Sequence, residues 1–240
     1  MSGPIGEVWV YLAASPLLGL TVTLLAYQVA HALYRKSGQH PLANPVLIAV
    51  AILGTLLGLT GTAYETYFAG AQFVHFLLGP ATVALAVPLY LQFRRVRKLL
   101  LPISAGLLAG SATAVVSAVA IARLLGADSA TQASLAPKSV TTPIAMGIAE
   151  KIGGLPSLTA VLVICTGVFG AIVGERAMAA IRVHDPAIRG FAMGVAAHGI
   201  GTARAFQINE QSGAFAALAM GLNGLLTAAL LPLLADFLLK

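Results

Sequence analysis

The sequence predicts an all-α, polytopic membrane protein with broken or re-entrant helices. Hydrophobic residues make up 58% of the 240-residue chain, charged residues make up only 9%, and the mean hydropathy is +0.90. A soluble domain of this length carries about 25% charged residues. Apolar runs recur along the chain with no linker between them, so we expect residues 1–240 to form a single transmembrane domain.

The first half of the chain contains three apolar runs. Val8–Leu33 and Leu42–Leu59 are long enough to cross a bilayer. Only one charge precedes Arg35, so the chain lacks the basic start of a signal peptide and we expect the first span to be retained. Thr60–Phe76 is rich in aromatic and polar residues, which favours an interfacial segment. Leu77–Phe93 contains two prolines and should be bent or interrupted.

The second half alternates spans with glycine-rich or proline-rich segments. Leu99–Ala122 is free of charge and forms the fourth predicted span. The segment around Pro137 follows it, and Leu155–Gly174 is a further long span. Gly190–Phe206 is rich in glycine, and Ala214–Leu239 is the last apolar run. Pairs of glycines four residues apart permit close helix contacts, within one chain or in a homo-oligomer.

Positive charge marks the loops expected to face the cytoplasm. The net charge of +6 comes from 14 basic and 8 acidic residues, and we interpret the basic ones as topology signals and not as nucleic-acid contacts. The clusters Arg35–Lys36, Arg94–Lys98 and Arg176–Arg189 all face the cytoplasm only if residues 137–153 enter the membrane and return on the same side. We therefore expect a re-entrant hairpin around Lys138, with its turn near residues 152–156.

One polar motif interrupts the apolar pattern between Pro137 and Pro143. It contains one cation and three hydroxyls, from Lys138, Ser139, Thr141 and Thr142. A lysine at the centre of a membrane helix costs roughly 2.5–3.5 kcal/mol, so its presence indicates a use for the charge. Each proline also removes an amide donor and disfavours helix in the residue before it. The alternative is a lysine that extends to the membrane interface from a helix end.

A second polar motif lies between Ala197 and Arg204. Glycines loosen the helix where polar side chains occur, and the candidate residues are His198, Gly199, Gly201, Thr202 and Arg204. Arginine is a bidentate ligand for carboxylate or phosphate. The alternative is that Arg204 reaches the interface and His198 is a core residue with its hydrogen bonds satisfied.

The two motifs together contain cations without an obvious acidic partner. All eight acidic residues fall near the ends of predicted spans or in loops: Glu7, Glu65, Asp128, Glu150, Glu175, Asp185, Glu210 and Asp236. An anionic ligand would balance the cations, helped by the positive ends of broken helices. His198 is suited to carry a coupling proton. Sodium bound by hydroxyls, Asn223 and free carbonyls is the alternative, and no other cofactor is expected.

A short internal similarity adds two residues to the predicted site. Residues 79–83 (Gly-Pro-Ala-Thr-Val) resemble residues 136–140 (Ala-Pro-Lys-Ser-Val). If this is a repeat, Pro80 and Thr82 meet Lys138 and Ser139 at one site, as in transporters built from inverted repeats. Chance similarity between proline-containing apolar segments is the alternative.

The chain resembles the LrgB/CidB family over nearly its whole length. The similar motifs are Asn44-Pro45, residues 64–67 (Tyr-Glu-Thr-Tyr), residues 78–90, residues 137–145, residues 153–160, residues 197–203 and residues 213–220. The resemblance implies a bacterial cytoplasmic (inner) membrane protein that acts beside a small LrgA/CidA-like membrane partner.

For function, the resemblance implies two alternatives. Bacterial members are described as antiholin-like or holin-like modulators of murein hydrolase activity and autolysis, whereas the plastid member exchanges glycolate and glycerate and some bacterial pairs are linked to pyruvate uptake. A cationic, hydroxyl-lined site without a buried acid favours the carrier of small carboxylate anions. No HExxH motif, paired aspartates or serine nucleophile with a spaced base occurs, so we do not expect an enzyme.

Overall fold

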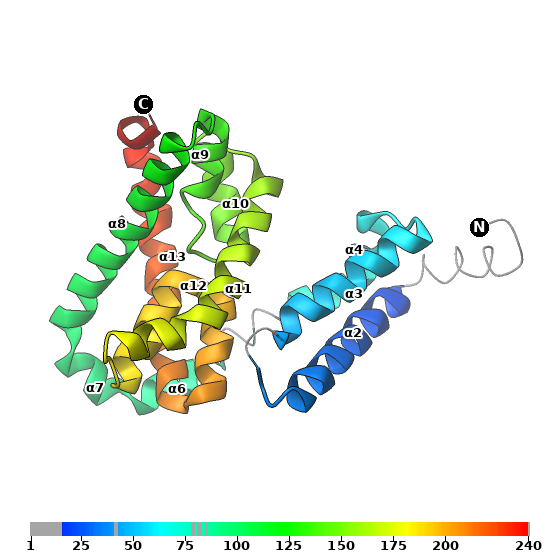
Figure 1. Ribbon diagram of the computed structural model, residues 1–240, viewed down its shortest axis with the longest axis horizontal. Helices are drawn as coiled ribbons and strands as arrows, with labels where there is room; N and C mark the ends of the chain where they lie inside the picture. Colours follow the sequence, from blue (N-terminus) through cyan, green and yellow to red (C-terminus); the bar gives the residue numbers. More distant parts are fainter. Residues whose placement is uncertain (1–15, 41–42, 78–79, 81–82, 85, 240) are drawn as a thin grey trace, which may run out of the picture. The chain divides into compact units, whose positions relative to one another are not determined.

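The computed structural model describes residues 16–40, 43–77, 80, 83–84 and 86–239, and every regular element within them is helical (Figure 1). Four of the helices are long and apolar enough to cross a membrane, namely Leu17–Lys36, Leu100–Leu124, Pro156–Ala180 and Glu210–Leu239. The prediction of an all-α fold is confirmed, and the long apolar helices are those of a polytopic membrane protein.

The helices form two compact units, residues 1–84 and 85–240. In the first unit, α2 (Pro16–Lys36) packs against both α3 (Pro45–Thr60) and α4 (Tyr64–Phe76). The hydroxyls of Thr23 and Tyr67 lie 2.7 Å apart and join α2 to α4.

Three predictions about the first unit stay open. The expected start of the first span at Val8 lies outside the described residues, as does part of Leu77–Phe93. The expected interfacial segment forms α4, and its depth in the membrane stays a prediction. The chain enters the second unit through two short helices, α6 (Ala86–Leu91) and α7 (Phe93–Lys98).

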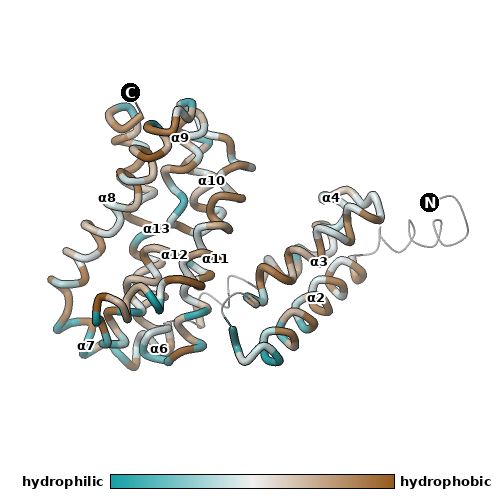
Figure 2. Tube along the Cα trace, viewed as in Figure 1, coloured by the Kyte–Doolittle hydropathy of each residue, from teal (hydrophilic) through white to brown (hydrophobic). Residues whose placement is uncertain are grey.

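Three long helices frame the second unit: α8 (Leu100–Leu124), α11 (Pro156–Ala180) and α13 (Glu210–Leu239). All three are apolar enough to cross a membrane, and hydrophobic residues recur along α8 in Figure 2. The helices α8 and α13 run in the same direction, because the hydroxyls of Ser111 and Thr227 lie 3.5 Å apart while Arg123 Nη2 donates to the Leu238 carbonyl at 2.8 Å.

The segment between α8 and α11 is a helical hairpin, which we call hairpin A (residues 129–151). Its arms are α9 (Ser129–Leu135) and α10 (Thr142–Lys151). Ser129 and Lys151 line the same cleft of about 420 Å³ beside Asp236 and Leu239, so the arms begin and end at the same end of the unit. Figure 2 shows a hydrophilic stretch in the connection between them.

Prolines and glycines explain where hairpin A breaks. Asp128 is the N-cap residue of α9 and accepts from the Thr131 amide at 2.7 Å, and hydrogen bonding by Thr131 holds the pKa of Asp128 below its ordinary range. Pro137 follows its last turn, and Pro143 fits the first turn of α10, where an amide donor is not needed. The tip is therefore residues 136–141.

The turn of hairpin A does not lie at residues 152–156, where it was expected; it is the tip at residues 136–141, between α9 and α10. Residues 152–155 join α10 to α11 at the base, where Gly153 adopts φ +83°. Ser134 Oγ accepts from the Leu155 amide at 2.7 Å, and the Thr159 hydroxyl donates to the Ser134 carbonyl at 3.0 Å. A Cβ on Gly154 would lie 2.8 Å from the Ser134 amide nitrogen, so this base requires glycine.

The helix α12 (Pro186–Ile208) is a second hairpin, which we call hairpin B (residues 186–208). Its helical geometry breaks at Ala197 and His198. The first arm runs parallel to α13, because Gly190 lies against the backbone of Ser212 and Gly194 lies against Ala216.

The second arm of hairpin B runs back along α13. Thr202 donates to Met220 Sδ at 3.8 Å, and Gly213 lies against the ring of Phe206. The close contacts of Gly190 and Gly194 are made within the chain, whereas a Cβ on Gly54 or Gly58 would meet nothing within 4 Å among the described residues.

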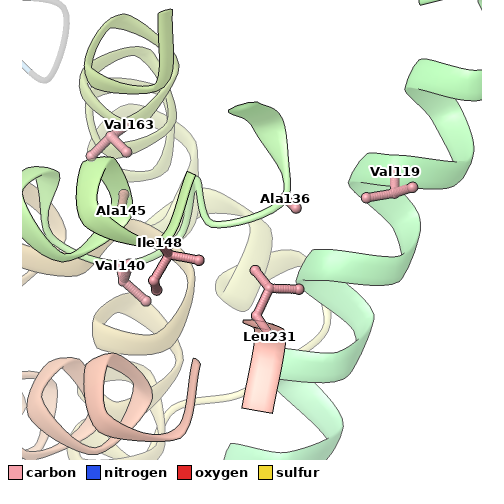
Figure 3. Packing of buried hydrophobic residues seen from close by; sticks show 7 residues of the cluster. All are labelled: Val119, Ala136, Val140, Ala145, Ile148, Val163 and Leu231. Atoms are coloured by element: carbon pink, nitrogen blue, oxygen red, sulfur yellow. The ribbon is translucent and has the colours of Figure 1, made fainter. Parts of the chain in front are cut away.

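A hydrophobic cluster supports the tip of hairpin A (Figure 3). Its buried members come from α8, hairpin A, α11 and α13: Val119, Ala136, Val140, Ala145, Ile148, Val163 and Leu231. In a protein whose outer face meets lipid, this tight packing fixes the tip mainly through dispersion contacts.

Candidate functional site

The tips of hairpins A and B meet at Asn223, near the middle of the 30-residue α13. Asn223 Nδ2 donates to the Ser139 carbonyl of hairpin A at 3.2 Å and to the Val195 carbonyl of hairpin B at 3.1 Å. Asn223 is only 1% exposed. We call this meeting point of residues 136–141, residues 195–198 and Asn223 the crossing.

His198 forms the tip of hairpin B and is buried. Its Nε2 lies 2.9 Å from the Val163 carbonyl of α11. A carbonyl only accepts, so Nε2 carries a hydrogen and Nδ1 remains for a second partner or a proton. Gly167 lets the ring approach α11, since a Cβ there would lie 2.7 Å from His198 Cε1.

Lys138 lies at the tip of hairpin A, between the buried residues Pro137 and Ser139. Its Nζ is 3.5 Å from Ser139 Oγ, and the ammonium is close enough to interact electrostatically with His198. Within the described part of the chain, no carboxylate forms an ion pair with Lys138. The helix N-termini of α10 and of the second arm of α12 present free amides and positive partial charge at the crossing, and the C-termini of α9 and of the first arm of α12 present carbonyls there.

The remaining residues of the two motifs support the hairpin tips. The Thr202 hydroxyl donates to the His198 carbonyl at 2.8 Å, and Gly201 packs against Met193 in the opposite arm. Gly199 follows the break directly. Thr141 is the N-cap residue of α10, Thr142 is its first residue, and both are partly buried.

Arg204 differs from the expectation of an unbalanced cation. Its Nη2 lies 3.3 Å from Glu175 Oε2 of α11, and Nη1 donates to Gln207 Oε1 at 3.3 Å. Arg204 lies six residues beyond His198 in the second arm of α12, about 9 Å along the helix axis. The sequence placed Glu175 just beyond a span expected to end at Gly174 and did not predict this pair, whereas α11 continues to Ala180 and carries Glu175 within the helix.

The structure does not test the two site residues that the internal similarity added, Pro80 and Thr82. Pro80 belongs to the first unit, and Thr82 lies outside the described residues, so the internal similarity to residues 136–140 stays a prediction.

Sequence reasoning missed the carbonyls of Val163 and Val195 and the glycine that admits His198. A backbone carbonyl leaves no trace in the sequence, but Gly167, Gly170 and Gly174 recur at helical spacing in α11. A Cβ on Gly170 would also crowd the Ala197 side chain. This glycine face was the available signal for a close neighbour.

Comparison with known proteins identifies the family. The sequence pattern of the LrgB-like family matches residues 23–237, which is most of the chain. The chain belongs to the LrgB-like family. No solved structure matches it.

Several curated proteins are similar to this LrgB-like chain over most of their length. The uncharacterized protein YwbG of Bacillus subtilis (strain 168) is 36% identical over 221 residues, 92% of this chain and 98% of that protein. The antiholin-like protein LrgB of Bacillus mycoides (strain KBAB4) is 32% identical, covering 93% of this chain and 97% of that protein. The antiholin-like protein LrgB of Bacillus cereus (strain B4264) is 31% identical with the same coverage, 93% and 97%.

Proposed function

We propose that this LrgB-like protein is a secondary transporter of small monocarboxylates, of the pyruvate, lactate, glycolate or glycerate class, in the bacterial cytoplasmic membrane. One observation carries the proposal: two hairpins that open at opposite ends of the unit meet at Asn223, beside Lys138 and His198. Broken helices that meet at mid-membrane and present their ends to a substrate are the recurring design of secondary transporters.

The arrangement also supports an inverted repeat. Hairpin A with α11 (residues 129–180) and hairpin B with α13 (residues 186–239) each consist of a hairpin followed by a long helix, and the two pairs point in opposite directions. This repeat differs from the one suggested by residues 79–83. Alternating access would then move the two pairs against each other around the crossing.

In the proposed mechanism, Lys138 attracts the carboxylate of the cargo. Ser139, Thr141 and Thr142 bond its other oxygens, because hydroxyls both donate and accept. His198 takes up a coupling proton at Nδ1 while Nε2–H remains bonded to Val163. Sodium held by hydroxyls and free carbonyls is the alternative coupling ion. Arg204 attracts the carboxylate of the cargo only from a distance and does not bind it directly, since Glu175 already pairs with its guanidinium.

Uptake of labelled substrate into proteoliposomes tests the proposal. We expect Lys138→Ala to reduce saturable uptake of pyruvate, lactate, glycolate and glycerate at least ten-fold, because it removes the charge that binds the carboxylate. Lys151→Ala is the matched control, since Lys151 lies exposed at the base of the same hairpin. Equal saturable uptake by wild type and Lys138→Ala would remove Lys138 from the site.

A regulator of murein hydrolase activity and autolysis is the second candidate function, favoured by the name antiholin-like protein LrgB of several relatives. An LrgA/CidA-like membrane protein would be the partner in either case. Absence of carboxylate uptake when such a partner is reconstituted together with the protein would favour the regulator over the carrier.

A further inference from the structure

The Asn223 side chain uses both of its donor hydrogens but leaves its acceptor without a partner. Nδ2 bonds the Ser139 and Val195 carbonyls. Oδ1 is buried, and no donor among the described residues reaches it. The orientation of the amide is determined by its neighbours, because a flipped amide would place Oδ1 against two carbonyls that cannot donate.

An unpaired buried acceptor is unfavourable and calls for a hydrogen-bond donor. Oδ1 and Nδ2 are bonded to the same carbon, so Oδ1 lies at the crossing, where the proposed function places the cargo. Ser139, Thr141 and Thr142 do not distinguish a hydroxyl from a keto oxygen, because their hydroxyls serve either group. Oδ1 does distinguish them, since it only accepts.

We propose that Asn223 determines the specificity of the site: its Oδ1 accepts a hydrogen bond from the 2-hydroxyl of the cargo, so that 2-hydroxy monocarboxylates are selected over 2-keto acids. The inference rests on the proposed function and narrows its substrate class. A keto oxygen has only lone pairs to present to Oδ1, and the acceptor would stay unpaired. A site built to bond a hydroxyl rejects analogues that lack it for this reason.

Ligand-induced thermal stabilisation of the purified wild-type protein tests the inference without requiring transport. The ligands are lactate, pyruvate and 2-fluoropropionate, in which fluorine replaces the hydroxyl with an atom of similar size that does not donate. We expect lactate to give half-maximal stabilisation at a concentration roughly ten-fold lower than the other two.

The outcomes separate the inference from the proposed function. Equal half-maximal concentrations for the three ligands, as expected if a buried water bonds Oδ1, or a preference for pyruvate, would overturn the inference and leave a carboxylate site. Absence of stabilisation by any of them would overturn both.

Two variants assign the preference to a residue. Asn223→Leu removes the acceptor, and we expect the folded variant to bind lactate and pyruvate with a ratio near one. Thr227→Val, one turn along α13 and bonded to Ser111, should keep the ten-fold ratio. A folded Asn223→Leu protein that retains the preference would exclude Asn223, and the wild-type ligand series decides the question if this variant does not fold.

Discussion

At the scale of single residues, His198 has a backbone conformation that residues with a Cβ rarely adopt, with φ 42° and ψ −133°. Such strain costs of order 1–3 kcal/mol, and the conformation persists only where several surrounding contacts hold the residue in place. Here the ring is bonded to Val163, and the carbonyl accepts from Thr202. These contacts hold the imidazole at the crossing, where a proton carrier would be needed.

A methyl group on α11 should displace this imidazole. In Gly167→Ala, the new Cβ would lie 2.7 Å from His198 Cε1 and 2.8 Å from Nε2, so the ring must move and its bond to Val163 is lost. Overpacking of this kind costs about 1–3 kcal/mol. We expect carboxylate uptake to fall at least ten-fold in proteoliposomes containing equal amounts of folded protein.

Gly174→Ala is the matched control on the same helix, because its Cβ would make an ordinary contact of 3.7 Å with Met193 Cγ. It should transport at the wild-type rate. Wild-type uptake by Gly167→Ala would show that the position of His198 does not matter for transport.

The sequence indicated some of these residues and not others. Lys138, His198 and Asn223 are polar residues in apolar runs, and the energetic cost of placing them there marks them. Ser139 and Val195 contribute backbone carbonyls, which every residue has. Only the fold reveals which carbonyls are available to accept a hydrogen bond from a side chain. The bond between Asn223 and Ser139 joins residues 84 positions apart.

At the scale of elements, prolines predicted hairpin A better than glycines predicted hairpin B. Pro137 lies in the tip of hairpin A and Pro143 in the first turn of α10, and the turn lies between the two arms and not at residues 152–156. Hairpin B reverses at Ala197 and His198 without a proline. Its glycines indicated a loosened helix, but they serve mainly as contact points with α13, so the reversal could not be predicted from them.

The base of hairpin A should be sensitive to a single methyl group. In Gly154→Ala, the Cβ would lie 2.8 Å from the Ser134 amide nitrogen, and backbone atoms cannot move aside as a flexible side chain can. We expect the unfolding free energy to fall by about 1–3 kcal/mol, seen as a lower Tm in detergent.

Gly147→Ala tests whether this loss is specific to the base. Gly147 lies within α10, and its Cβ would meet nothing within 4 Å among the described residues. Alanine favours a helix interior by about 1 kcal/mol over glycine, so Tm should stay the same or rise. If Gly154→Ala and Gly147→Ala shifted Tm equally, the packing of the base against Ser134 would not be limiting.

At the scale of the whole molecule, hydropathy predicted the four long apolar helices, because lipid imposes the same requirement on each of them separately, whereas the expected span Leu42–Leu59 forms the shorter helix α3. The crossing is different, since it depends on contacts between α11, α13 and both hairpins. The charges nevertheless agree with the arrangement. Arg95 pairs with Asp185 at 2.6 Å, which joins the basic α7 to the base of hairpin B.

This arrangement predicts which face of the membrane each hairpin base meets. Basic residues gather at the base of hairpin B, including Arg94, Arg182 and Arg189, so this end should face the cytoplasm and the base of hairpin A should face outward. After exposed Cys165 is replaced by serine, single cysteines would be placed at Ser129 and Lys151 for hairpin A, and at His184 and Glu210 for hairpin B.

In right-side-out vesicles, a membrane-impermeant maleimide should label Ser129→Cys and Lys151→Cys before permeabilisation, and His184→Cys and Glu210→Cys only after it. The reason is that each hairpin starts and finishes on one face, so the two cysteines of a pair share one compartment. The Cys165→Ser protein without added cysteines gives the background. If Ser129→Cys and Lys151→Cys were labelled from opposite faces, residues 129–151 would cross the bilayer, and the two hairpins could not approach a shared site from opposite sides.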